Sequence, residues 1–108
     1  MIEIRFSPEA ISDLQQTKTY IAEELCSEAA SVRTVANILK RIRMLSEFPD
    51  AGAALSDVVG FQTEYRYLVC GNYTAFYQHK QETIYVVRVL YCRRDFMRVL
   101  FDASTERN

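Results

Sequence analysis

The sequence predicts an α+β fold in which a two-helix hairpin packs on one face of a mainly antiparallel, four-stranded sheet. Three observations lead to this prediction: a short alternating run at the N-terminus, two segments with apolar residues at helical spacing, and three β-prone runs in close succession. Packing an apolar helix face on an apolar sheet face is the common two-layer solution. With 108 residues, the chain is expected to form one domain over residues 1–108, with a frayed tail at about 102–108.

The N-terminal segment predicts a strand followed by a helix. Apolar and polar residues alternate over residues 2–6, which is the period of a half-buried strand. Ser7-Pro8-Glu9 is typical of a helix start, because serine caps, proline fits the first turn and an acid suits the positive helix end. The helix is predicted from Pro8 to about Leu25. Its predicted apolar stripe comprises Ile11, Leu14, the stem of Lys18, Ile21 and Leu25.

A second helix is predicted after a short break at Cys26. Ser27 is its candidate cap, and Pro49 marks its end. Two amphipathic helices with a short link form an antiparallel hairpin. The segment 53–63 is predicted as a loop with a bend at Gly60. The predicted apolar stripe of the second helix comprises Val32, Val35, Ala36, Leu39, Ile42, Leu45 and Phe48.

Three β-prone runs follow, separated by turns at Gly71-Asn72 and Lys80-Gln81-Glu82. The last run is apolar on both faces apart from Arg88, which predicts a central strand. After it, Asp95 can cap a short C-terminal helix that ends at about Phe101. The predicted strands are Glu64–Val69, Tyr73–His79 and Thr83–Tyr91.

Composition excludes several classes of protein. No run approaches the roughly 18 apolar residues that span a bilayer, and no secretory signal precedes the first strand, so a cytoplasmic protein without a membrane partner is expected. A net charge of −1 argues against a general nucleic-acid binder. Cys26, Cys70 and Cys92 are odd in number and lack C-x-x-C spacing, so no disulfide framework, metal site or cofactor is expected.

Charge is distributed unevenly along the chain. Residues 1–64 hold six Lys or Arg against ten Asp or Glu, whereas residues 65–101 hold six against two. The second half is therefore the predicted location of a partner site. Arginine binds carboxylate or phosphate in bidentate fashion, and tyrosine stacks on rings. The candidate target-binding residues are Arg66, Arg88, Tyr91, Arg93, Arg94 and Arg98.

A structural role for some of these arginines stays open at this point. Arg66 and Arg88 lie inside predicted strands and could face each other, neutralised by Asp95 or by helix-end carbonyls. The pair 93–94 precedes a helix, where positive charge is unfavourable, so an anionic partner explains it better. Catalytic groups are scarce, because the single histidine, His79, is interpreted as a solvated turn residue and no nucleophile–base pair can be assembled.

The ordered set of segments DLQQTKTYIAEEL, MLSEFPDAG, EYRYLVCGNYTAFYQ and IYVVRVLYCRRD resembles the RelE/ParE superfamily. The resemblance covers roughly Ile4 to Leu100. Members of this superfamily are toxins of bacterial type II toxin–antitoxin modules, with a small sheet and a helix hairpin on one side. The resemblance therefore implies the same fold and an antitoxin partner whose C-terminal segment wraps the toxin. Exposed parts of both helices and the sheet edge at Ile2–Phe6 are the expected antitoxin contacts.

The superfamily holds two activities. ParE-like members inhibit DNA gyrase, whereas RelE-like members cleave mRNA on the ribosome without a metal ion. The run Arg88–Asp95 resembles the ParE-like ending, and Thr74 stands where RelE-like sequences carry an arginine, so gyrase inhibition is favoured. In the ribonuclease alternative, the resemblance assigns catalysis to Arg66, Tyr91 and Arg93. A third alternative is an inactive module that only binds antitoxin.

Overall fold

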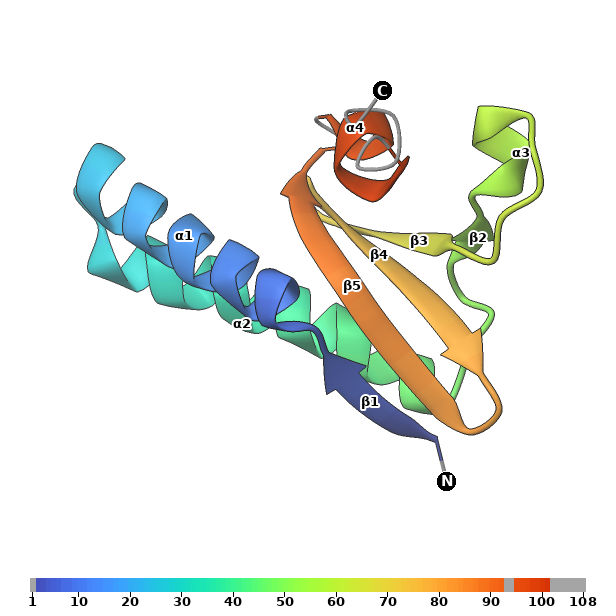
Figure 1. The fold of residues 1–108 in the computed structure, drawn as a ribbon. Coiled ribbons are helices and arrows are strands. Elements are labelled where there is room, and N and C mark those ends of the chain that lie inside the picture. Colours follow the sequence, from blue (N-terminus) through green and yellow to red (C-terminus); the bar gives the residue numbers. More distant parts are fainter. Residues whose placement is uncertain (1, 93–94, 102–108) are drawn as a thin grey trace.

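The structure is a computed structural model that describes residues 2–92 and 95–101 (Figure 1). In these ranges one five-stranded sheet has the order β1-β5-β4-β3-β2, with β1 parallel to β5 and the other neighbours antiparallel. The predicted α+β class is confirmed, but the sheet has one strand more than the four predicted. The strands are β1 (Glu3–Phe6), β2 (Ala53–Ala54), β3 (Arg66–Cys70), β4 (Tyr73–Lys80) and β5 (Thr83–Tyr91).

The helices begin largely where the sequence predicts. The Ala30 N–H donates to Ser27 Oγ at 3.1 Å, and the Ala10 N–H donates to Ser7 Oγ at 2.9 Å, so both predicted caps are confirmed. One four-residue helix lies in the segment predicted as a loop, and it ends at Gly60 with a φ of 80°. No helix of the described ranges is long and apolar enough to cross a membrane. The helices are α1 (Pro8–Glu24), α2 (Glu28–Arg43), a 3₁₀ turn η1 (Met44–Ser46), α3 (Ser56–Val59) and α4 (Phe96–Phe101).

The predicted buried stripe of α1 is only partly confirmed: Ile21 is buried and Leu14 packs against the core, but two other members of the stripe are exposed. Ile11 and Leu25 are 47% and 63% exposed. The helix is rotated because it packs against the edge of β5, where polar side chains have backbone groups to satisfy. Its buried residues are Ala10, Asp13, Thr17 and Ile21.

The stripe of α2 is also shifted from the predicted one. Val32 is 52% exposed and Phe48 is 58% exposed, whereas Ser31 is fully buried. The Ser31 hydroxyl donates to the Glu28 carbonyl at 2.8 Å, so its burial leaves no unpaired hydroxyl. A small residue satisfied by its own helix can therefore replace a larger apolar residue in the buried face. Ile38 and Ile42 complete that face.

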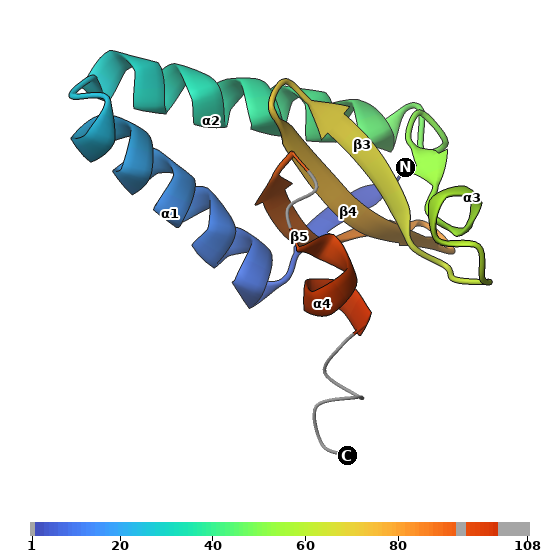
Figure 2. The ribbon, with the colours of Figure 1, turned by 90° about the horizontal axis from the view of Figure 1, so that it is seen from above.

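Strand β4 is the centre of the sheet and is covered on both faces. Figure 2 shows α2 and α4 on opposite sides of the sheet. On the α4 side, the Phe96 ring stacks on Phe76 with centroids 5.6 Å apart. Strand β5, predicted to be central, lies between β1 and β4. On the helix-hairpin side, Ala75 and Tyr77 of β4 belong to a core with Ile38, Ile42, Leu45, Leu68, Ile84, Val86 and Val89.

Candidate functional site

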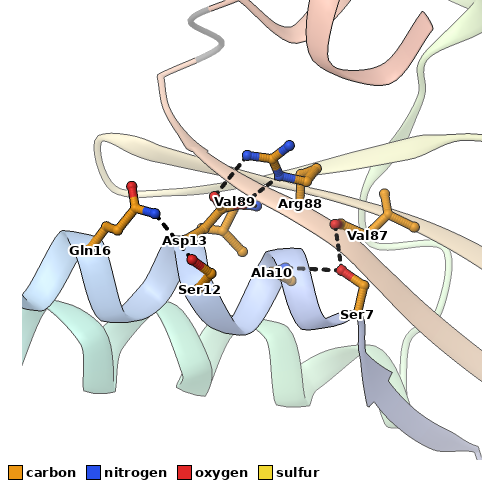
Figure 3. A network of polar contacts seen from close by, with 8 residues as sticks. All are labelled: Ser7, Ala10, Ser12, Asp13, Gln16, Val87, Arg88 and Val89. Carbon is orange, nitrogen blue, oxygen red and sulfur yellow. Dashed lines mark hydrogen bonds and ion pairs between the residues drawn. The ribbon is translucent and has the colours of Figure 1, made fainter. Parts of the chain in front are cut away.

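Side chains at the start of α1 form hydrogen bonds with backbone groups on the edge of β5, beyond the point where β1 stops pairing with β5. β1 ends opposite Val86, and a β-bulge in β5 follows. Beyond that point the Ser7 hydroxyl donates to the Val87 carbonyl at 2.7 Å, and the Val89 N–H donates to Asp13 Oδ2 at 2.9 Å (Figure 3). Side chains of one helix therefore take the place of the missing strand.

Arg88 is neutralised inside the fold by Asp13. Its Nε and Nη2 donate to the two carboxylate oxygens at 2.8 and 2.9 Å (Figure 3). The Asp13 side chain is 9% exposed, and that of Arg88 is 29% exposed. Hydrogen bonding to Asp13 raises the pKa of Arg88; burial opposes this shift, and the charges of Asp13 and Glu9 add to it. The internal acid is thus Asp13 rather than the predicted Asp95.

Arg66 and Arg88 do not face each other, so that prediction is wrong. Arg66 of β3 is opposite Tyr77, Arg88 of β5 is opposite Phe76, and β4 lies between them. The Arg66 Nη2 donates to the Gly52 carbonyl at 2.7 Å, in the loop that follows η1. Arg66 is therefore held by a loop carbonyl and not by the predicted helix-end carbonyls or Asp95.

His79 lies within β4, in agreement with the predicted strand Tyr73–His79, but it is half-buried and is not the solvated turn residue expected. It lines a pocket of about 540 Å³ together with Arg66, Lys80 and Glu64. His79 Nε2 and Arg66 Nε are both buried and have no hydrogen-bond partner among the described residues. This pocket lies toward the opposite end of β4 from Tyr73.

Tyr91 lies at the end of β5, far from Arg66. Tyr91 is opposite Tyr73, whereas Arg66 is opposite Tyr77. Four residues of strand correspond to roughly 13 Å, and two strand spacings add roughly 10 Å across the sheet. The Tyr91 ring is 49% exposed and packs edge-on against Tyr73 at 5.4 Å. Arg66 and Tyr91, two of the three candidate ribonuclease residues, therefore do not lie in one site.

The C-terminal arginines are only partly described. Arg98 pairs with Asp95 at 3.1 Å, with both side chains more than half exposed. Arg93 and Arg94 lie outside the described residues, as does the tail at 102–108, so these predictions stay predictions. The residues on either side of the arginine pair, Cys92 and Asp95, have φ values of 53° and 57°.

A groove of about 970 Å³ lies between the helix hairpin and the end of the sheet. The hairpin projects beyond the strands (Figures 1 and 2), so α1 and α2 form one wall and the β3–β4 turn with the end of β5 forms the other. Burial raises the pKa of Tyr73, and a hydrogen bond with Thr17 of the opposite wall opposes this shift. The groove is lined on its two walls by Thr17, Tyr20, Thr34, Arg41, Tyr73 and Tyr91.

The sequence matches the family described as ParE toxin of type II toxin–antitoxin system, parDE, over residues 4–96. The chain belongs to this family. The predicted RelE/ParE resemblance and the predicted toxin role are thus confirmed, and the partner of a toxin in such a module is its antitoxin.

Two solved structures share the fold of this ParE toxin. A chain of the chromosomal ParDE toxin–antitoxin system from P. aeruginosa superposes with a TM-score of 0.71 and 18% identity, covering 84% of this chain and 96% of that one. A chain of the E. coli DinJ–YafQ complex superposes with a TM-score of 0.50 and 13% identity, covering 94% and 99%. No curated protein matches the toxin in sequence. Within its described ranges, no group of three or more His, Cys, Asp or Glu could hold a metal ion.

Two residues of the ParE toxin site were missed by sequence reasoning. Arg41 of α2 lines the groove, and its Nε and Nη2 donate to the Val69 carbonyl at 3.2 and 3.1 Å. No sequence signal identifies it, because the neighbouring Lys40 and Arg43 carry the same charge on the same helix. Asp13 could have been found from the sequence. It lies on the same face of the helix as Ala10 and Ile21, and the single arginine in an otherwise apolar strand, Arg88, needs an acidic partner.

Proposed function

We propose that this ParE toxin inhibits DNA gyrase and performs no catalysis of its own. Membership of the ParE family carries the proposal, because gyrase inhibition is the usual role of ParE toxins. The action is expected in the cytoplasm, where gyrase acts on DNA. Among the sequence candidates, Arg93 and Arg94 are the proposed gyrase contacts, because two adjacent cations suit an anionic partner.

The placement of the candidate ribonuclease groups argues in the same direction. Metal-independent RNA cleavage needs a proton-transfer group and a cationic clamp acting on one phosphate. Arg66 is hydrogen-bonded to the loop at Gly52, and Tyr91 lies across the sheet from it. Arg88 is paired with Asp13. This separation favours gyrase inhibition over mRNA cleavage.

A supercoiling assay tests the proposal. Purified toxin is expected to block gyrase supercoiling, and Arg93→Glu or Arg94→Glu is expected to reduce the block at least about tenfold, since each places a negative charge where a cation is needed. Arg33→Glu, on the exposed face of α2, is the matched control for charge. Normal supercoiling at saturating toxin would contradict the proposal. Transcript cleavage in a translating extract, abolished by Tyr91→Phe, would instead support the ribonuclease; neither activity would support the inactive module.

We also propose that the antitoxin fills the groove between the helix hairpin and the sheet. Its volume suits the apolar face of a partner helix, a common mode of peptide recognition. Tyr20 and Leu25 line it and are 60% and 63% exposed, so the groove offers apolar surface that a partner can cover. Arg41 at its border favours an acidic residue on the antitoxin.

A matched pair of substitutions tests the groove. Thr34→Arg places a long cation in the groove and is expected to weaken antitoxin binding at least about tenfold. Thr19→Arg makes the same change on the exposed surface of α1 and is expected to leave binding unchanged. Calorimetric titration of each toxin variant with antitoxin gives the affinities. Equal affinities for the two variants would show that the antitoxin binds elsewhere.

A further inference from the structure

Strand β1 has an unpaired outer edge. The Glu3 N–H donates to the Glu82 carbonyl at 2.8 Å, and the Ser7 N–H donates to the Val86 carbonyl at 2.9 Å. Backbone groups of a strand point alternately to its two sides, so the N–H and C=O of Ile4 point away from β5. Nothing in residues 2–92 or 95–101 pairs with these outward groups. The edge can therefore accept a further strand.

The opposite edge of the sheet is already obstructed. β2 covers only the first two residues of β3, Arg66 and Tyr67. Beyond them, the Arg41 guanidinium occupies the Val69 carbonyl with two hydrogen bonds. A strand approaching from that side would have to displace both β2 and Arg41. Of the two edges, β1 is the one that offers free backbone groups over its full length.

The residues of this edge are complementary to themselves. The run is Ile2-Glu3-Ile4-Arg5-Phe6. When two copies are placed antiparallel about Ile4, Ile4 faces Ile4, each Glu3 faces Arg5 of the other copy, and each Ile2 faces Phe6. We propose that a second copy of this chain pairs with the β1 edge in this register, about a two-fold axis at Ile4. The contact is isologous, because each copy contributes the same patch.

The direction of the backbone groups agrees with this register. In an antiparallel pair, residues whose backbone groups point toward the partner exchange two hydrogen bonds, and the residues between them bring their side chains closest together. The outward groups belong to Ile4, so the two Ile4 residues exchange the hydrogen bonds. Glu3 and Arg5 then fall at the positions where cross-strand side chains approach most closely, which suits an ion pair.

The opposite charges of Glu3 and Arg5 favour pairing of the β1 edge with the same edge of a second copy. In one copy the Arg5 Nε donates to Glu3 Oε2 at 3.2 Å, with side chains 64% and 58% exposed. Both side chains are free to turn toward the other copy, giving two cross-strand ion pairs. An edge with charges of one sign would repel its copy. The short strand predicts a weak, concentration-dependent dimer.

Charge reversal tests the proposal. Sedimentation velocity of the full chain over a range of concentrations is expected to show a monomer–dimer equilibrium. Glu3→Arg alone and Arg5→Glu alone each place like charges opposite each other and are expected to weaken self-association at least about tenfold. An equimolar mixture of the two variants restores both ion pairs and is expected to associate as the unmodified chain does. Arg33→Glu on α2 is the control for net charge and is expected to change nothing.

Amide hydrogen exchange gives a second readout that depends on the register. The Ile4 and Phe6 amides are expected to gain protection with protein concentration, whereas the Glu3 amide, paired with β5, is protected at every concentration. A chain that stays monomeric, or a mixture no better than the single variants, overturns the proposal. A dimer in which the Ile4 amide stays unprotected also overturns it. Protection of the Ile4 amide that appears only when antitoxin is added would assign the edge to the antitoxin instead.

Discussion

Asp13 and Arg88, 75 positions apart in sequence, are joined by two hydrogen bonds of 2.8 and 2.9 Å. The same carboxylate accepts the Val89 N–H at 2.9 Å. One side chain of α1 therefore neutralises the arginine and satisfies the bulged strand edge. The pair therefore ties α1 directly to the sheet, and both of its residues line the groove.

Asp13→Asn is expected to destabilise the toxin by about 2–4 kcal/mol, because it leaves a half-buried guanidinium without a counter-charge. Urea denaturation followed by circular dichroism measures the change. Glu23→Gln, an exposed acid near the other end of the same helix, is the control and is expected to change stability by less than about 0.5 kcal/mol. Equal effects of the two substitutions would show that the ion pair contributes little.

Gly52→Ala is expected to destabilise the fold by about 2 kcal/mol or more through overpacking. A Cβ there would lie 2.6 Å from the Tyr77 hydroxyl and would also meet the Tyr67 carbonyl, and neither group can move freely. The Tyr77 hydroxyl itself donates to the Pro49 carbonyl at 2.9 Å. Gly60→Ala is the comparison, since it has open space and a φ of 80°. Its expected cost is about 1–2 kcal/mol, from backbone strain alone. Thermal denaturation of both variants checks this order, and a Gly60 effect larger than the Gly52 effect would contradict it.

Stability is expected to fall at alkaline pH because of Cys70. Burial raises the pKa of its thiol from 9.0 to about 11; the positive charge of Arg41 and a backbone hydrogen bond oppose this shift. The folded state then binds the proton more tightly than the unfolded state. This contribution is complete below about pH 9 and is lost as pH rises toward 11, with a total of about 3 kcal/mol.

Urea denaturation at several alkaline pH values measures how steeply the free energy of unfolding falls with pH, and Cys70→Ala is expected to make this slope smaller. Part of the slope should remain, because burial also raises the pKa of Tyr73 above 10.0. An unchanged slope in the alanine variant would show that other groups cause the alkaline loss.

The three cysteines are expected to differ in reactivity. Cys26 and Cys92 are exposed, whereas Cys70 is buried. Since the thiolate is the reactive form, a buried thiol with a raised pKa reacts slowly. A thiol reagent should therefore modify the first two rapidly in the folded toxin and Cys70 only after unfolding, with mass spectrometry identifying each site. Rapid modification of Cys70 in the native state would contradict its burial.

Local sequence chemistry predicted much of the fold. Ser7 and Ser27 cap the two long helices as expected, and β5 spans the predicted Thr83–Tyr91. These features depend on near neighbours in the chain. β2 was missed because two alanines carry no β pattern, and only pairing with β3 makes them a strand.

The site was less predictable, because sequence identifies cationic side chains but not their partners. The pairing of Arg88 with Asp13 depends on where β1 ends and how α1 then packs, which are properties of the assembled fold. Arg41 likewise acquires its role from the unpaired end of β3. The groove forms because the helix hairpin extends beyond the ends of the strands. This difference in length depends on how several segments assemble, so no single segment of the sequence reveals it.

The overhang of the hairpin also has an evolutionary consequence. Residues around its tip, such as Glu23, Glu24 and Ala29, are exposed. Substitutions there cost little folding free energy, because surface changes away from packed groups are usually close to neutral. The part of the molecule that borders the groove can thus diversify while the sheet stays constant. The surface beside the partner site can in this way change in sequence while the scaffold is kept.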